Sequence, residues 1–278
     1  MSRIAAVQMA SGPNVGANLI EAERLLALAV DQGAELVVLP ENFALMGLTE
    51  ENKLKSAEQE GVGPIQDFLS RQAMQYHIWI VGGTIPLLAP DPRKVFAACL
   101  LYDDQGERVA RYDKMHLFDV CLEDHAESYA ESQTTLPGDR VVVAATPFGK
   151  IGLAVCYDLR FPELFRCMLD AGAELFAVPA AFTAFTGKAH WEVLVQVRAI
   201  ENLCFVIAAA QGGYHINGRE TYGNSMIVDP WGGGINRLQN GAGVICADIE
   251  LENLRAIRRG FPAISHRKLH ICQGRDTD

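Results

Sequence analysis

Hydrophobic residues along the chain follow two periods, one typical of buried strands and one typical of helices. Short runs of β-branched and small apolar residues predict the strands, and stripes that repeat every three or four positions predict the helices. In residues 15–31, for example, Ala22, Leu25, Leu26 and Ala29 fall on one helical face. Strands are expected at residues 4–9, 36–40, 78–85, 95–102, 108–112, 141–146, 151–156, 175–179, 205–210, 225–228 and 244–249, and helices at residues 15–31, 64–76, 162–171, 188–202 and 251–259.

The order of these elements predicts an α/β fold with mixed sheets. Helices between strands indicate parallel crossovers, whereas turns at residues 103–106 and 230–234 indicate antiparallel neighbours. The expected strands are many for one open sheet, which favours two packed sheets. No linker rich in Ser, Gly or Pro interrupts the 278 residues, so we expect a single domain over residues 1–278. The polar, irregular stretch at residues 119–135 is expected to form a loop over an active site.

Composition and charge narrow the classes of protein. An apolar content of 49% and a charged content of 21% are those of an ordinary globular protein with a substantial core. The formal net charge of −10 argues against nucleic acid or an anionic membrane as the main partner. The apolar run at residues 203–210 is far too short to cross a bilayer, and the N-terminal apolar stretch fits a first strand better than a signal peptide.

The cysteines also narrow the classes of protein and the cellular compartment. The seven cysteines contain no Cys-x-x-Cys pair, so neither a zinc ribbon nor a thioredoxin-type dithiol is expected. An odd number of cysteines without a secretion signal fits a reducing compartment. We therefore expect a cytoplasmic protein with no bound metal, whose partner is a small molecule.

Three chemically reactive side chains each follow a strand pattern directly. They are Glu41 after residues 36–40, Lys114 after residues 108–112, and Cys156 at the end of residues 151–156. Open α/β sheets place their ligands at the carboxyl ends of strands, so these side chains can meet in one crevice. Each also has an ordinary structural explanation, namely a solvated loop residue for Glu41 and Lys114 and a small core residue for Cys156.

Together these groups would support nucleophilic catalysis. The Glu41 carboxylate would accept the proton of the Cys156 thiol as the sulfur attacks a carbonyl or nitrile carbon. The Lys114 ammonium and the backbone N–H of Tyr157 would stabilise the negative charge of the tetrahedral intermediate. A thioester would form, an amine would leave, and water would then release the acid.

The motifs around these residues resemble those of the carbon–nitrogen hydrolase (nitrilase) superfamily over essentially the whole chain. They are Leu39-Pro-Glu41, Tyr112-Asp-Lys-Met-His-Leu-Phe118 and Gly152-Leu-Ala-Val-Cys-Tyr-Asp-Leu-Arg-Phe-Pro-Glu163. The resemblance implies a four-layer α-β-β-α sandwich with two packed mixed sheets, a Glu–Lys–Cys triad and no cofactor. It also implies a second glutamate, here Glu131 in residues 131–139, which would position Lys114 or assist the proton transfers.

Within the superfamily, the chain is similar to the deaminated-glutathione amidase branch, with the omega-amidases as close relatives. This similarity rests on residues 114–120, 180–192, 198–202, 208–211, 222–232 and 261–268. It implies a cysteine-dependent amidase for a small carboxylate-bearing amide, with deaminated glutathione giving 2-oxoglutarate and Cys-Gly. Tyr157, Arg160, Phe182 and Thr186 would bind the substrate, although Arg160 could instead form an ion pair with Glu163 at a helix start. The acidic loop at residues 121–128, which flanks the pocket, departs from the Gly and Pro that relatives often have there.

Other functions remain open from the sequence. One is an omega-amidase acting on 2-oxoglutaramate, or another hydrolase of small amides or nitriles. Another is a catalytically inactive scaffold of the same fold, against which the intact Glu41, Lys114, Glu131 and Cys156 argue. The resemblance also implies a homo-oligomer, such as a homodimer. The helix at residues 188–202 would lie in the core or at that interface, and the tail at residues 261–278 is expected at the interface.

Overall fold

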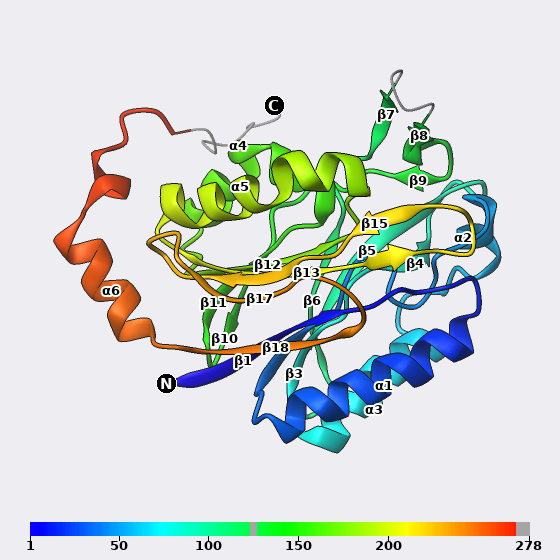
Figure 1. Ribbon diagram of the computed structural model, residues 1–278, viewed down its shortest axis with the longest axis horizontal. Coiled ribbons are helices and arrows are strands. Elements are labelled where there is room, and N and C mark those ends of the chain that lie inside the picture. The colour runs from blue at the N-terminus through cyan, green and yellow to red at the C-terminus, as the bar shows by residue number, and fades with distance from the viewer. Residues whose placement is uncertain (123–126, 271–278) are drawn as a thin grey trace.

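Two mixed β-sheets pack face to face, and helices cover the outer face of each sheet (Figure 1). The computed structural model describes residues 1–122 and 127–270. Helices α4 (Pro162–Asp170) and α5 (Ala184–Asn202) lie on the smaller sheet, and α1 (Val15–Asp31) and α3 (Pro64–Tyr76) lie on the larger one. This arrangement is the four-layer α-β-β-α sandwich expected from the sequence, and the prediction is confirmed.

The larger sheet combines parallel strands at its centre with antiparallel strands at its sides. Its main order is β18-β1-β2-β3-β5-β4, and β6 and β9 also pair with β5. The strands are β1 (Ser2–Gln8), β2 (Leu36–Val38), β3 (Trp79–Val81), β4 (Ile85–Leu88), β5 (Val95–Tyr102), β6 (Arg108–Asp113), β9 (Thr135–Leu136) and β18 (Gly243–Ile249).

The smaller sheet has the order β10-β11-β12-β13-β16-β17, in which β11, β12 and β13 are parallel neighbours. Two short hairpins, β7–β8 and β14–β15, stand apart from both sheets. The remaining strands are β7 (Asp119–Leu122), β8 (Glu127–Ala130), β10 (Val143–Thr146), β11 (Gly149–Leu153), β12 (Leu175–Ala180), β13 (Phe205–Ala210), β14 (Gly212–Tyr214), β15 (Glu220–Tyr222), β16 (Ser225–Val228) and β17 (Gly234–Leu238).

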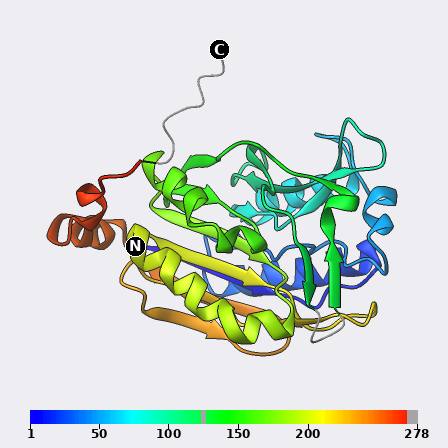
Figure 2. The same ribbon diagram turned by 90° about the horizontal axis from the view of Figure 1, so that it is seen from above.

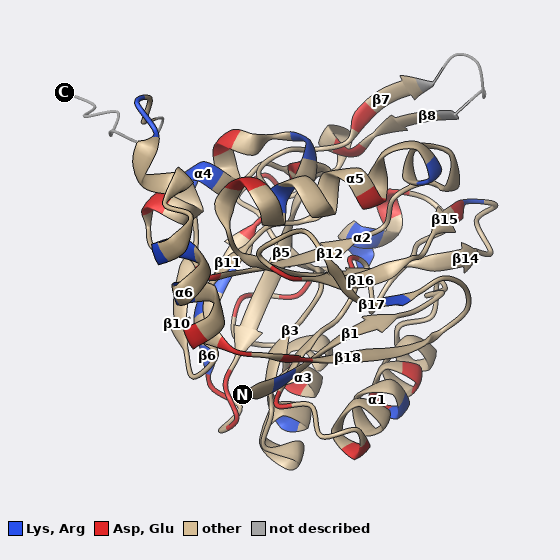
Figure 3. Ribbon diagram, turned by 60° about the vertical axis from the view of Figure 1, so that its left-hand side comes forward, with Lys and Arg blue, Asp and Glu red and all other residues tan. Residues whose placement is uncertain are grey.

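Helix α6 (Leu251–Gly260) extends from one end of the sandwich, as Figure 2 shows from above. Short elements complete the chain: α2 (Glu51–Lys55) and the 3-10 turns η2 (Glu131–Gln133), η3 (Cys156–Arg160) and η4 (Ala263–His266). The positions of Lys, Arg, Asp and Glu are coloured on the ribbon in Figure 3, many of them on the outer helices and the loops. Within the described residues, no helix is long and apolar enough to cross a membrane.

Side chains that alternate between the two faces of the central strands contribute to two separate hydrophobic cores. On β1, Ile4 and Ala6 face the core between the sheets, while Ala5 and Val7 face the core beneath α1 and α3. Successive side chains of a strand point to opposite faces, so a strand buried on both faces must be apolar throughout. This explains why these strands are uninterrupted hydrophobic runs in the sequence.

The structure corrects several expected boundaries. The strand expected at residues 78–85 is two strands, separated at Gly82 and Gly83. Gly83 has φ +56°, and a Cβ there would lie 2.1 Å from the carbonyl oxygen of Pro40. A glycine is therefore required where this turn packs against the loop that carries Glu41.

The site-bearing segments also differ from expectation. The strand expected at residues 151–156 ends at Leu153, and Cys156 starts η3. Helix α5 starts four residues earlier than expected, because the Thr183 side chain caps it by accepting a hydrogen bond from the Thr186 N–H. The expected irregular loop at residues 119–135 contains the β7–β8 hairpin, η2 and the start of β9. Its residues 123–126, and residues 271–278 of the tail, lie outside the described residues.

Candidate active site

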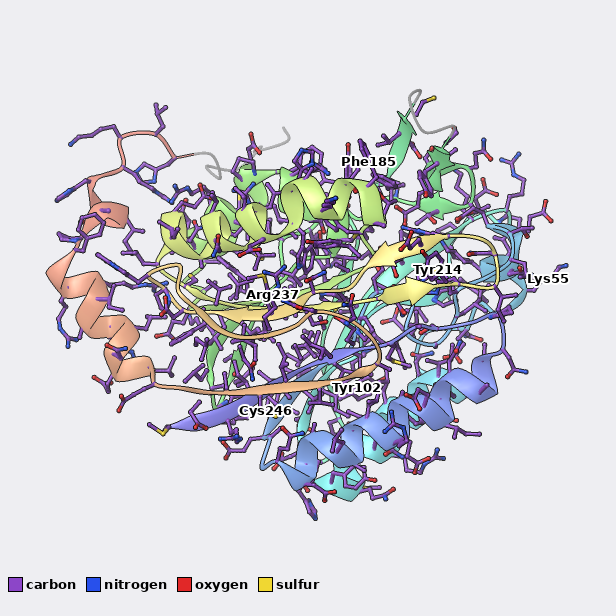
Figure 4. The ribbon with its side chains drawn as sticks, in the orientation of Figure 1. Lys55, Tyr102, Phe185, Tyr214, Arg237 and Cys246 are labelled. Carbon is purple, nitrogen blue, oxygen red and sulfur yellow. The ribbon has the colours of Figure 1, made fainter. Side chains whose placement is uncertain are left out.

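The four expected catalytic side chains line one cavity at an end of the sandwich. Glu41 follows β2 and Lys114 follows β6, both in the larger sheet, whereas Cys156 follows β11 in the smaller sheet. Glu131 starts η2, just after the β7–β8 hairpin. The cavity therefore lies where strand ends from both sheets meet. In Figure 4, two labelled residues lie at this end of the molecule: Phe185, near the start of α5, and Tyr214, on β14.

The backbone around Glu41 is fixed from several sides. Its carbonyl oxygen accepts a hydrogen bond from Nε2 of Gln211, at 3.0 Å, just beyond β13. The next residue, Asn42, has φ +57°, and its N–H donates to Oγ1 of Thr84 at 2.9 Å. Asn is among the residues that tolerate this left-handed conformation. The carboxylate is therefore held at a defined place, with only 4% of Glu41 exposed.

Lys114 joins the two glutamates. Its Nζ donates to Oε1 of Glu41 and to Oε2 of Glu131, each at 2.8 Å. Burial by itself would lower the Lys114 pKa, but Glu131 and Glu41 outweigh it and raise that pKa well above its usual value. Burial likewise opposes the charge of Glu131, yet Lys114 lowers the Glu131 pKa to about 2. The lysine is therefore a buried ammonium at neutral pH.

Cys156 lies next to this ion cluster on a strained turn. Its φ is +50°, a rare conformation for a residue with a side chain. The backbone N–H of Ala181 donates to its Sγ at 3.5 Å, and Cys156 lines the same cavity as Glu41 and Lys114. Burial and the Glu41 charge raise the Cys156 pKa well above its usual value, against the opposing effect of Lys114. The sulfur is therefore a thiol at rest and needs a base at the moment of attack.

Asp158 joins the lysine segment to the cysteine turn, a link that no sequence pattern predicted. Its fully buried carboxylate accepts hydrogen bonds from the Tyr112 hydroxyl at 2.7 Å and from the Val155 N–H at 2.8 Å. It also accepts from the His116 N–H at 3.1 Å. Residues before Lys114, after Lys114 and before Cys156 thus converge on one carboxylate, which fixes the two reactive groups relative to each other. In the sequence, Asp158 is one of two charged residues in a short turn, and nothing there indicates its distant partners.

The four expected substrate-binding residues line the same cavity: Tyr157, Arg160, Phe182 and Thr186. The Arg160 guanidinium lies over the rings of Tyr157, at 5.8 Å, and Phe182, at 5.5 Å. Its hydrogen-bond partner is Nδ1 of His190, at 3.3 Å. Within the described residues it forms no ion pair with Glu163, the alternative left open by the sequence.

Other residues that line the cavity were not predicted from the sequence, and Lys53, Tyr129 and Arg219 are among them. Lys53 belongs to α2, and its Nζ donates to Oε2 of Glu50 at 2.7 Å. Arg219 comes from the loop between β14 and β15. These residues lie in short polar segments without periodicity, so nothing in the sequence separates them from ordinary loop residues.

Comparison with known proteins agrees with this geometry. The carbon–nitrogen hydrolase family model matches residues 3–259. A deaminated glutathione amidase of Synechocystis sp. (strain PCC 6803 / GT-S) is 45% identical over 266 residues, which cover 95% of this chain and 97% of the relative.

Solved structures show the same fold. The NitFhit protein of C. elegans superposes with a TM-score of 0.88 at 34% identity; the match covers 96% of this chain but 65% of that longer one. A mutant of the amidase from Nesterenkonia sp. AN1 superposes with a TM-score of 0.78 at 27% identity, over 94% of this chain and 98% of that one. That amidase carries the product of Michael addition of acrylamide at its active-site cysteine. From the family match over nearly its whole length, this chain belongs to the carbon–nitrogen hydrolase family.

Proposed function

We propose that this protein is a cysteine-dependent amidase that hydrolyses deaminated glutathione to 2-oxoglutarate and Cys-Gly. The observation that carries the reaction type is that Cys156 lines one cavity together with the buried Glu41–Lys114–Glu131 ion cluster. The substrate rests on the names of the relatives and on Arg160, a cation with no carboxylate partner among the described residues of the cavity.

In the first half-reaction, Sγ of Cys156 attacks the amide carbon while Glu41 accepts the thiol proton. The carbonyl oxygen becomes negative, and the Lys114 ammonium and the Tyr157 N–H would stabilise that charge. Because the surroundings of Lys114 raise its pKa, it acts as a permanent cation and leaves the proton transfers to Glu41. The C–N bond then breaks, and Glu41 returns the proton to the leaving amine, which yields a thioester on Cys156.

In the second half-reaction, water attacks the thioester carbon and Glu41 accepts one of its protons. The C–S bond breaks, the acid is released, and the sulfur recovers its proton. Glu131 has a positioning role in this scheme, since its Oε2 accepts hydrogen bonds from Lys114 Nζ and from the Phe118 N–H, each at 2.8 Å. Arg160, with Thr186, would bind the carboxylate of the 2-oxoglutaryl group.

The second candidate is an omega-amidase acting on 2-oxoglutaramate, which presents the same acyl group to Arg160 but releases ammonia. Both products should therefore be measured with each amide: 2-oxoglutarate, and either Cys-Gly or ammonia. We expect kcat/KM for deaminated glutathione to exceed that for 2-oxoglutaramate and for a simple nitrile. A higher kcat/KM for 2-oxoglutaramate would make that amide the substrate in place of deaminated glutathione, and the amidase mechanism would stand.

We also propose that the protein is a homo-oligomer. One face of α5 is core, since Trp191 and Val195 are buried, but the opposite face exposes Val193, Val197 and Ile200 at helical spacing. Trp231, 60% exposed, belongs to the same surface, because Gly232 lies directly against the Ile200 side chain. Exposed apolar clusters of this kind are characteristic of association surfaces.

Light scattering after size-exclusion chromatography tests this proposal. The expected mass is at least twice the 30.4 kDa of one chain. Ile200→Glu would place a charge in the apolar surface and should shift the mass toward that of one chain. Val62→Glu changes a residue that is 65% exposed elsewhere and should leave the mass unchanged. A wild-type protein that elutes with the mass of a single chain at micromolar concentration would disprove the proposal.

A further inference from the structure

Arg219 is held at the mouth of the cavity by a well-anchored loop between β14 and β15. Its N–H donates to Oδ1 of Asn217 at 3.0 Å, and its carbonyl oxygen accepts from the His215 N–H at 2.9 Å. Asn217 donates in turn to the Gly47 carbonyl oxygen at 2.8 Å, and the His215 ring contacts the Ser11 carbonyl oxygen at 2.8 Å. The loop therefore fixes the arginine relative to the segments that follow β1 and β2 of the larger sheet.

The guanidinium of Arg219 retains unused hydrogen-bonding capacity. Nη2 donates to the Ala181 carbonyl oxygen at 2.6 Å, but Nε is buried without a hydrogen-bond partner. Four cations line the cavity. Lys53 pairs with Glu50, and Lys114 pairs with Glu41 and Glu131. Among the described residues, Arg160 and Arg219 have no carboxylate partner, so two guanidinium groups of the cavity carry a positive charge that no carboxylate neutralises.

These two guanidinium groups occupy different places around the cavity. Arg219 lies 5.2 Å from the centre of the Tyr129 ring, and Arg160 lies 5.8 Å from that of Tyr157. Between those two rings lies Phe118, with centroid separations of 5.0 Å and 5.1 Å. On the other side, Arg160 lies over Phe182, which follows the Ala181 that accepts from Arg219. The contacts close a ring of residues around the cavity: Arg219, Tyr129, Phe118, Tyr157, Arg160, Phe182 and Ala181.

Arg219 is the guanidinium on the open side of this ring. It also lines a second, adjoining cavity, together with Gly47, Asn217 and Gly218, whereas Arg160 does not line that second cavity. The amine must depart before water can attack the thioester, so the leaving group should point toward the adjoining open space. The acyl group stays bound to Cys156, on the side of Arg160.

We propose that Arg219 forms a carboxylate-binding subsite for the leaving amine. This inference rests on the proposed function: deaminated glutathione has one carboxylate on its 2-oxoglutaryl part and a second on the glycine of the leaving Cys-Gly. Arg160 binds the first and Arg219 binds the second. The class of substrate is then an amide with a carboxylate at each end, and Arg219 selects for a leaving amine that bears one, such as a dipeptide.

A matched substrate pair isolates this subsite. Deaminated glutathione and its C-terminal glycinamide differ only in the leaving-group carboxylate. A hydrogen-bonded arginine–carboxylate pair corresponds to roughly 10- to 100-fold in binding. Arg219→Ala should therefore lower kcat/KM by about that factor for the acid, mainly through KM, and by less than about 3-fold for the glycinamide. Arg219→Lys should keep part of the preference for the acid. Arg93→Ala removes an equal charge from a side chain that is 85% exposed and ion-paired with Asp91, and should change neither value.

The outcomes separate this inference from the proposed function. Equal losses for the acid, the glycinamide and 2-oxoglutaramate in Arg219→Ala would mean that Arg219 acts only through Ala181 and the cysteine turn, which would overturn the subsite. A wild-type enzyme that cleaves the acid and the glycinamide equally well would also overturn it. If the wild-type enzyme turns over 2-oxoglutaramate but not deaminated glutathione, the proposed substrate is wrong, and the Arg219 subsite is wrong as well.

Discussion

Cys156→Ser should abolish amide hydrolysis while the fold and the oligomer persist. A hydroxyl is far harder to deprotonate than a thiol, and a carboxylate such as Glu41 is too weak a base to remove its proton. Serine is nearly isosteric with cysteine and is no more strained at φ +50°, so the turn should remain in place. Steady-state turnover and thermal unfolding, measured on the same preparation, test both halves of this expectation.

Another cysteine provides the matched control. Cys246 is a free, largely buried thiol on β18, away from the cavity (Figure 4). Cys246→Ser should therefore keep wild-type turnover. Mass spectrometry of enzyme quenched during turnover should place the acyl group on Cys156 and on no other thiol. Substantial activity of Cys156→Ser, or an adduct on another cysteine, would show that Cys156 is not the nucleophile.

The buried strands could be predicted from the sequence because burial alone dictates their composition. Strands β5, β13 and β16 match the expected ranges, since each is an apolar run bounded by turn residues. Strand β17 was not expected: it is mostly exposed, and its pairing with β16 defines it as a strand. The β7–β8 and β14–β15 hairpins were missed for the same reason, because their partners and not their own periodicity set their conformation.

The residues of the candidate site likewise include some that could be predicted from the sequence and some that could not. Glu41, Lys114 and Cys156 could be selected because each follows a strand, and strand ends from both sheets meet at the cavity. Glu131 follows no central strand, and only its resemblance to a family motif drew attention to it.

Asp158 and Arg219 could not be selected from the sequence. Their importance depends on contacts between segments far apart in the chain, such as Asp158 with Tyr112 and Arg219 with Ala181. Local sequence patterns carry no information about which of many polar residues will meet a distant partner.

Deaminated glutathione should be hydrolysed far better than glutathione, although the two differ only at the α-carbon of the glutamyl end. Glutathione carries an ammonium group there, whereas the deaminated form carries a neutral keto oxygen. Arg160 and the permanently charged Lys114 would repel that ammonium, and burying it without a partner is costly. We expect kcat/KM to differ by roughly 10³-fold or more in competition assays. Comparable hydrolysis of the two would contradict the substrate assignment and leave the amidase chemistry unaffected.

The pH dependence of that ratio identifies its cause. Two substrates that compete for one enzyme experience the same enzyme ionisations, so these cancel in the ratio of their kcat/KM values. What remains is the titration of the glutathione amine. If the ammonium charge causes the poor hydrolysis of glutathione, the ratio of kcat/KM for deaminated glutathione to that for glutathione should fall as pH rises through the pKa of that amine. The uncharged amine avoids both the repulsion and the desolvation penalty. A ratio that stays constant through that range would mean that the site distinguishes the two molecules by the shape of the keto group and not by charge.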